Sequence, residues 1–199
     1  MKVTFIKAIA IPASTMKIVV MNGSPRSNGN TAGLVKAIVD AIPKDVSVEV
    51  VNLYPMRIAG CRNCGACQKG DVDGYCTIRD DMSDLYPKYL EADLVILASP
   101  IYMWQFTTCI NAFMSRLHCL FRDEGDVNLA KGKRIAVAMT MGDDEFVAGS
   151  AMNALLDFCE YFHLRYVGAV AVPFASKEQI DRPLYREKVG DFVSQLLNG

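Results

Sequence analysis

The residues best suited to chemistry lie between Lys17 and Thr31, where an apolar run gives way to a polar loop. The run Ile18-Val19-Val20-Met21 predicts a strand, and an apolar helical period follows the loop at once. The loop itself reads Asn22-Gly23-Ser24-Pro25-Arg26-Ser27-Asn28-Gly29-Asn30-Thr31. The first N–H groups of a helix have no partner within it, and the helix dipole is positive at that end. The loop is therefore suited to bind an anion such as phosphate.

Hydroxyls, an amide and a guanidinium in this loop are candidate donors to a phosphate group. They are Ser24, Arg26, Ser27, Asn30 and Thr31. A loop that serves phosphate transfer ends in Gly-Lys-Ser/Thr, whereas this loop ends in Gly29-Asn30-Thr31, and the dinucleotide pattern G-x-G-x-x-G is absent. We therefore expect the phosphate of a held cofactor. The alternative is an ordinary polar connection between a strand and a helix.

Two later loops also follow apolar runs that predict strands. Because parallel strands end at the same edge of a sheet, we expect these loops to converge with the phosphate loop on one crevice. Aromatic and sulfur-containing side chains in the first loop can support a flat ring, and the backbone of the second can bond its polar edge. The candidates are Pro100, Ile101, Tyr102, Met103, Trp104, Thr140, Met141 and Gly142. The alternative is that Pro100 only ends a strand and Tyr102 caps the core.

Four cysteines lie in an unusually long connection, residues 53–81. Cys61, Cys64 and Cys67 are separated by two residues each, and eight residues separate Cys67 from Cys76. This spacing suits a 4Fe-4S cluster, whereas zinc more often uses two separated pairs. Free or reversibly paired thiols are the remaining interpretation. Because the loop follows the second strand, we expect the cysteines to lie beside the same crevice.

Alternating strand and helix patterns from Lys17 onward predict a doubly wound α/β sheet. Strands are expected at 17–22, 46–53, 94–98, 134–139 and 166–172, with helices between them and a final helix at the end of the chain. The strongest helical stripe is expected to form core or dimer surface. It consists of Phe106, Ile110, Phe113, Met114, Leu117 and Phe121.

The remaining titratable residues carry structural expectations. The two histidines, His118 and His163, fall in helical patterns and are expected to be satisfied or at the surface. Consecutive acids are expected to form a solvated loop at Asp143-Asp144-Glu145 and to begin a helix at Asp80-Asp81. The cysteines outside the loop are expected to be small core residues: Cys109, Cys119 and Cys159.

The composition is that of one globular domain. The chain has 199 residues, of which 51% are hydrophobic and 22% charged, so a single domain over residues 17–199 is expected. A net charge of −1 argues against nucleic-acid binding, and no apolar run is long enough to span a membrane. Seven cysteines, an odd number, favour a reducing cytoplasm. Residues 1–16 are interpreted as an extension of unknown role.

In combination, several motifs resemble the NADPH-dependent FMN reductase and iron-sulfur flavoprotein branch of the flavodoxin-like fold. They are Gly23-Ser24-Pro25-Arg26 with Gly29-Asn30-Thr31, Ser99-Pro100-Ile101-Tyr102, and the run from Gly60 to Cys67 with Cys76 and Asp80-Asp81-Met82. The resemblance covers about residues 17–199. It implies a three-layer sandwich with a five-stranded parallel sheet in the order 2-1-3-4-5. It also implies FMN, with its phosphate bound by Ser24, Arg26, Asn30 and Thr31 and its ring near residues 100–104 and 140–142.

This resemblance implies an FMN-dependent oxidoreductase that takes electrons from NAD(P)H and passes them to a quinone, flavin or other small acceptor. The flavin would carry the chemistry, and no side chain is expected to be catalytic. The alternative is an electron carrier with a 4Fe-4S cluster on Cys61, Cys64, Cys67 and Cys76 and a ferredoxin-like partner. A third class is a catalytically silent ligand-binding domain. A homodimer or homotetramer is expected by resemblance, with neither nucleic acid nor membrane as a partner.

Overall fold

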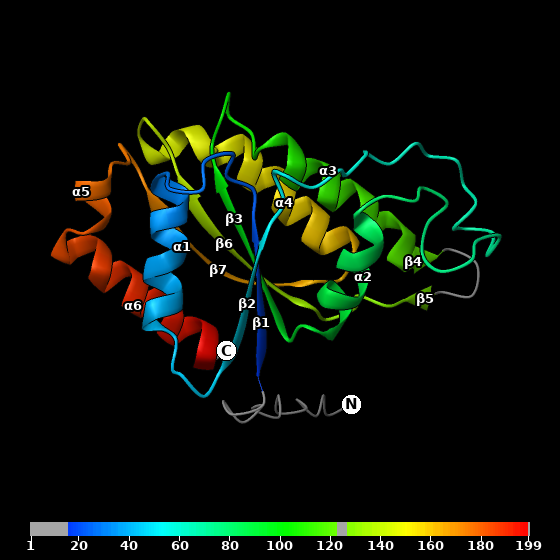
Figure 1. The fold of residues 1–199 in the computed structure, drawn as a ribbon, viewed down its shortest axis with the longest axis horizontal. Helices are drawn as coiled ribbons and strands as arrows, with labels where there is room; N and C mark the ends of the chain where they lie inside the picture. Colours follow the sequence, from blue (N-terminus) through cyan, green and yellow to red (C-terminus); the bar gives the residue numbers. More distant parts are fainter. Residues whose placement is uncertain (1–15, 123–126, 199) are drawn as a thin grey trace, which may run out of the picture.

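A parallel sheet with helices on both faces organises residues 16–122 and 127–198, the parts of the chain that the computed structural model describes (Figure 1). Its strands are β1 (Lys17–Asn22), β2 (Ser47–Asn52), β3 (Leu94–Pro100), β6 (Arg134–Thr140) and β7 (Arg165–Val172). They pair in parallel in the order β2-β1-β3-β6-β7, which confirms the predicted order 2-1-3-4-5 and the flavodoxin-like fold class. The expected extension lies outside the described residues except for Met16, which is buried in the core.

The helices form two layers, and alternate residues of each strand face one layer or the other. On one face, α1 (Asn30–Ala41), α5 (Lys177–Ile180) and α6 (Pro183–Asn198) cover Ile18, Val20, Leu94 and Ile96. On the other face, α2 (Met82–Glu91), α3 (Thr108–Arg116) and α4 (Gly149–Tyr161) cover Val19, Met21, Val95 and Leu97. Strand β3 is buried along its whole length, as expected for the centre of a doubly wound sheet.

The helix predicted from the stripe between Phe106 and Phe121 is shorter than expected. Phe106 precedes α3, the 3₁₀ helix η2 (Leu117–Leu120) follows it, and Phe121 begins β4 (Phe121–Arg122), which pairs with β5 (Val127–Asn128). The carbonyl of Arg116, at the end of α3, accepts hydrogen bonds from two side chains: the Tyr86 hydroxyl at 3.2 Å and the Cys119 thiol at 3.2 Å. These bonds compete with a further α-helical turn. Four residues of the stripe nevertheless lie in the core and Met114 packs against it, as expected; the four are Phe106, Ile110, Phe113 and Leu117.

The structure corrects the expected setting of both histidines and supports the solvated acidic loop. His118 lies in η2 rather than in an α-helix, and His163 lies in a turn after α4 with a φ of +52°. The acids at 143–145 are exposed, and Asp144 accepts a hydrogen bond from the N–H of Phe146 at the start of η3 (Glu145–Ala148). Among the helices of residues 16–122 and 127–198, none combines the length and apolar content needed to cross a membrane.

Candidate functional site

Helix α1 begins at the end of the polar loop with no side chain to cap it. Gly29 occupies the N-cap position, no side chain accepts a hydrogen bond there, and the first turn contains no acidic residue. The first N–H groups of most helices are satisfied by a capping side chain or by water. Here they remain available to an anion, and the guanidinium of Arg26 belongs to the same loop.

The loop is held in shape by its own polar side chains. Asn22 accepts from the N–H of Ser24 at 3.1 Å and donates to the side chain of Asn52 at 2.9 Å. The hydroxyl of Ser24 is buried and bonds to both the carbonyl and the N–H of Arg26, at 3.2 and 3.3 Å. Ser24 therefore helps to hold the shape of the loop, and its expected role as a phosphate ligand stays a prediction.

Gly23 marks a close approach between the phosphate loop and the start of α3. A Cβ atom at this position would lie 2.4 Å from Cγ1 of Ile110 and 2.6 Å from Oγ1 of Thr107. Its N–H donates to the carbonyl of Ala98 at 2.8 Å, which continues the pairing of β1 with β3. The absence of a side chain thus lets two loops meet at the edge of the sheet.

The three loops predicted to converge do so around one crevice of about 490 Å³. Its walls are Arg26 and Asn30 from the first loop, residues 100–103 from the second and residues 140–142 from the third, together with Ala175. Ala175 follows β7 and carries no chemical signal that a sequence motif could reveal. Four predicted residues do not line the crevice: Ser24, Ser27, Thr31 and Trp104.

Two of the loop residues tie the crevice walls together. The hydroxyls of Thr31 and Thr140 lie 2.7 Å apart, and both residues are buried. The side-chain amide of Asn30 donates to the carbonyl of Ala175. The start of α1 is thereby joined to the end of β6 and to the segment after β7, so these three walls are positioned as a unit.

A tight turn forms the outer lip of the crevice. The backbones of Tyr102 and Gln105 exchange hydrogen bonds of 3.0 Å, and Met103 and Trp104 between them have φ values of +47° and +62°. Positive φ at both central residues is typical of a type I′ turn, which normally contains Asn or Gly. Met103 is 79% exposed and Trp104 is 51% exposed, and Trp104 does not line the crevice that it was expected to line.

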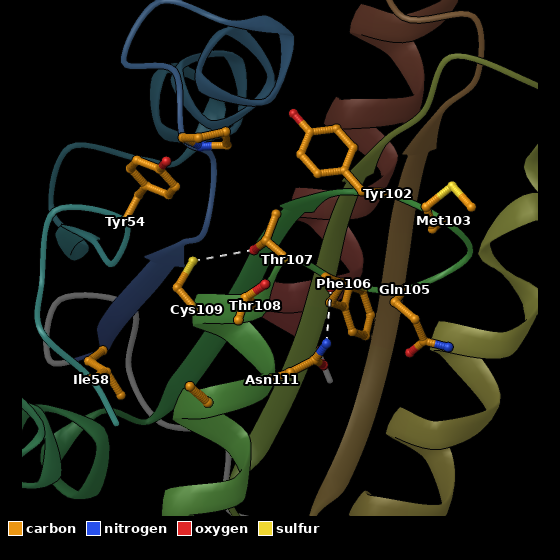
Figure 2. A pocket seen from close by; sticks show the side chains of 12 residues that line it. Tyr54, Ile58, Tyr102, Met103, Gln105, Phe106, Thr107, Thr108, Cys109 and Asn111 are labelled. Atoms are coloured by element: carbon orange, nitrogen blue, oxygen red, sulfur yellow. Dashed lines mark hydrogen bonds between the residues drawn. The ribbon is translucent and has the colours of Figure 1, made fainter. Parts of the chain in front are cut away.

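A second cavity, of about 470 Å³, adjoins the crevice and shares Tyr102 and Met103 with it. Figure 2 shows Tyr54 and Ile58, from the segment after β2, on the side opposite Tyr102. Cys109 lines this cavity and is half-buried, so it packs against the core, where it was expected, rather than deep within it. Its thiol donates to the carbonyl of Gly23 at 3.4 Å. The cavity depends on packing between distant segments, which the sequence motifs did not indicate.

The four loop cysteines surround one small enclosed cavity together with a fifth, Cys119. Arg116 and His118 also line it. Its free volume of about 20 Å³ admits one water-sized group. Within residues 16–122 and 127–198, no three metal-ligating side chains are close enough together to hold an ion as they are placed. Cys61 and Cys64 are exposed, however, and their side chains have room to move outward.

The cysteine cavity lies along α3 rather than beside the crevice, contrary to expectation. The loop begins at Tyr54, which lines the cavity that adjoins the crevice. Further along, the N–H of Cys61 donates to Ser115 at 3.3 Å and the Gln68 amide donates to the carbonyl of Phe121 at 2.8 Å. These contacts draw the loop toward the far end of α3, and Figure 1 shows it extending away from the strand ends. The nine residues of α3 span roughly 13 Å.

A buried ion pair, missed by the sequence analysis, closes this loop. Arg116 is 1% exposed, and its Nη1 donates to the carboxylate of Asp80 at 2.7 Å. Burial alone would raise the pKa of Asp80, but the hydrogen bonds from Arg116 and from the backbone of Ala59 hold it below its usual value. The sequence signal that could have indicated this pair is the position of Arg116, a charged residue next to the apolar helical stripe. Asp80 does precede α2, as predicted, but it also serves as this partner.

Comparisons with known proteins agree with this fold. The family model for NADPH-dependent FMN reductase matches residues 16–179. Two curated relatives are named iron-sulfur flavoproteins: one from Methanosarcina thermophila is 31% identical over 64% of this chain and 63% of its own, and one from Archaeoglobus fulgidus is 35% identical over 71% and 62%. The chain thus spans about three fifths of the length of these relatives. The solved structure of the NAD(P)H:quinone oxidoreductase from Methanothermobacter marburgensis superposes with a TM-score of 0.71 at 13% identity, covering 92% of this chain and 97% of that one.

Proposed function

Because the chain belongs to the NADPH-dependent FMN reductase family, we propose that it is an FMN-dependent oxidoreductase that oxidises NAD(P)H and reduces a quinone, a flavin or another small acceptor. One observation carries the proposal. The uncapped start of α1 opens beside Arg26 onto a crevice whose other walls are the segments after β3 and β6. An anion site and a ring-sized space are thus joined in a single crevice, which is the shape that a flavin mononucleotide requires.

The residues present fit FMN on chemical grounds. The free N–H groups of α1 and the guanidinium of Arg26 would bind the phosphate, and a single terminal phosphate matches the absence of an adenine-binding fingerprint. Pro100 to Met103 would support the flavin ring, and residues 140–142 would contact its polar edge. When bound, FMN supplies the hydride and electron chemistry, so the protein needs only to bind, orient and shield it.

The first experiment measures FMN binding and its dependence on Arg26. Loss of a charge-assisted phosphate contact should cost about 1.5–3 kcal/mol, or roughly tenfold to a hundredfold in affinity. The control is Lys36→Ala, which removes a cation from α1. The Lys36 side chain is 75% exposed and pairs with Asp40. We expect only Arg26→Ala to weaken FMN binding. Equal affinity of both variants for FMN would show that Arg26 does not bind the phosphate.

The second experiment tests electron transfer. Under anaerobic conditions NADH or NADPH should bleach the bound flavin, and a quinone or ferricyanide should restore its colour. If FMN binds but neither nicotinamide reduces it, the oxidoreductase proposal fails. Reduction by a reduced ferredoxin alone would then favour the electron carrier, and reduction by none of these donors would favour a silent binding domain.

A second candidate function is supported by the cysteine cavity. Four thiols from one loop line the same enclosed space, which is the donor set of a 4Fe-4S cluster, although the free volume requires that the exposed cysteines move outward to admit one. Cys61, Cys64, Cys67 and Cys76 would be the ligands, and the protein would exchange single electrons with a ferredoxin-like partner. Iron and acid-labile sulfide after anaerobic reconstitution, in the wild type and in Cys64→Ala, test this candidate. Absence of iron from both proteins would refute it.

We also propose a homodimer or homotetramer in a reducing cytoplasm. Tyr54, Met103 and Trp104 leave large apolar surfaces exposed around the crevice and the adjoining cavity, and such surfaces favour association. All seven cysteines are free thiols, which suits a reducing compartment. Sedimentation of the FMN-bound protein measures the assembly, and a monomer at micromolar concentration would contradict it.

A further inference from the structure

The floor of the cysteine cavity is formed by residues outside the cysteine motif. The most buried of them is Arg116, at the end of α3. Its Nη1 donates to the carbonyl of Ala59 at 2.9 Å, and its Nη2 donates to the carbonyl of Ile78 at 3.3 Å. One residue precedes the first loop cysteine and the other follows the last. A single guanidinium therefore holds both ends of the loop.

Asp80 strengthens this attachment from the other side. Its carboxylate accepts from Nη1 of Arg116 and from the N–H of Ala59, at 2.7 and 2.9 Å, and its second oxygen accepts from the N–H of Met82 at 3.2 Å. The ion pair thus joins the loop to both α2 and α3. Asp80 largely offsets the charge of Arg116. Any direct effect of the arginine on the cavity therefore depends chiefly on the N–H groups that do not bond to Asp80, Ala59 or Ile78.

One nitrogen of the guanidinium has no partner in the part of the chain that the structure describes. The Nε atom of Arg116 is buried and has no hydrogen-bond partner among the described residues. Burying an unpaired donor is costly, so such groups usually have a ligand, a water or an ion as a partner. Arg116 lines the same cavity as five cysteines: Cys61, Cys64, Cys67, Cys76 and Cys119. A sulfur-bound anionic centre in the cavity would offer the missing acceptor.

We propose that Arg116 is a positioning residue for a thiolate-ligated iron-sulfur centre: it closes the loop around the centre and donates its free Nε–H to one of the sulfur atoms. This inference rests on the second candidate function above. Hydrogen bonds to the sulfurs stabilise the more negatively charged, reduced state of such a centre, so they raise its reduction potential. Arg116 would therefore affect both retention of the metal and its potential.

The test compares Arg116→Lys and Arg116→Gln with the control Arg79→Gln. The lysine keeps the positive charge for Asp80 but has neither the fork that reaches Ala59 and Ile78 nor an Nε–H. Arg79 belongs to the same loop, is 62% exposed and pairs with Asp73, so its loss removes a loop cation away from the cavity floor. The full chain is loaded with FMN and reconstituted anaerobically with ferrous iron and sulfide. Iron, sulfide and FMN per chain are measured, and the midpoint potential is followed optically.

We expect the wild type and Arg79→Gln to hold the same iron at the same potential. Both Arg116 variants should either lose at least half of the iron or show an equilibrium constant for one-electron reduction at least tenfold smaller, which is a shift of about 59 mV. Retained FMN and an unchanged circular dichroism spectrum show that a variant has folded, and if Arg116→Gln does not fold, Arg116→Lys decides.

Full iron content and an unchanged potential in Arg116→Lys would overturn the inference and leave the electron-carrier function intact. Absence of iron from the wild type would refute that function and the inference together. Neither result bears on reduction of FMN by NAD(P)H, which its own experiment tests.

Discussion

Replacing Gly23 by alanine should destabilise the protein and disturb the phosphate loop. The added Cβ would lie 2.4 Å from Cγ1 of Ile110, about 1 Å short of the 3.4 Å at which ordinary contact begins. Thr107, at 2.6 Å, blocks movement in a second direction. Overpacking of this kind costs about 1–3 kcal/mol, which for a chain of this size lowers the melting temperature by roughly 2–12 °C. FMN should bind more weakly as well, because the loop must shift.

A matched substitution separates this clash from a general effect of alanine. Gly33 lies inside α1, and a Cβ there would be 3.5 Å from Cδ1 of Ile180, an ordinary contact. Gly33→Ala should therefore stabilise the protein by about 0.5–1 kcal/mol through helix propensity. Urea unfolding of the wild type and both variants measures the difference. If Gly23→Ala unfolds at the same urea concentration as the wild type, the close approach of Gly23 to Ile110 and Thr107 does not exclude a side chain at this position.

Three further predictions concern buried or perturbed polar groups. Thr31→Val should cost about 1–3 kcal/mol in urea unfolding, because the Thr140 hydroxyl is left unpaired, and adding Thr140→Val should cost less than the sum of the two single changes. Because the folded-state pKa of Asp80 is held below 3.8, its stabilising effect is present above about pH 4 and is lost as the pH falls further, so the stability difference between the wild type and Asp80→Asn should shrink in acid. In metal-free protein at pH 8, iodoacetamide should modify Cys64 before Cys119. The hydrogen bond with Thr77 lowers the pKa of Cys64, whereas burial raises that of Cys119 to about 11. Equal modification rates by mass spectrometry would contradict this order.

The sheet and the crevice were predictable because their signals are local. Each core strand is a short apolar run, and the loops that follow β1, β3 and β6 meet because parallel strands end at one edge. The expected helices at Leu34 and at Val189 were also found, since their apolar periods face the sheet. For these elements, periodicity within about ten residues contains most of the structural information.

The features that were missed depend on contacts between distant residues. Arg116 and Asp80 are 36 positions apart, and neither carries a motif that indicates the other. The position of the cysteines was wrongly expected because the loop follows α3 through contacts such as the one between Cys61 and Ser115. The turn at Met103 and Trp104 was hidden because neither residue type favours positive φ. Tertiary packing decides such cases, and a single sequence does not display it.

The turn between Tyr102 and Gln105 has a consequence for the thermodynamics of binding. Two residues with side chains are held in left-handed backbone conformations, at a cost of roughly 1–3 kcal/mol each, and the paired backbones of Tyr102 and Gln105 maintain them. That cost falls on folding rather than on association. A ligand that reaches this lip therefore meets a surface with little conformational entropy left to lose, and more of each contact's free energy is available as affinity.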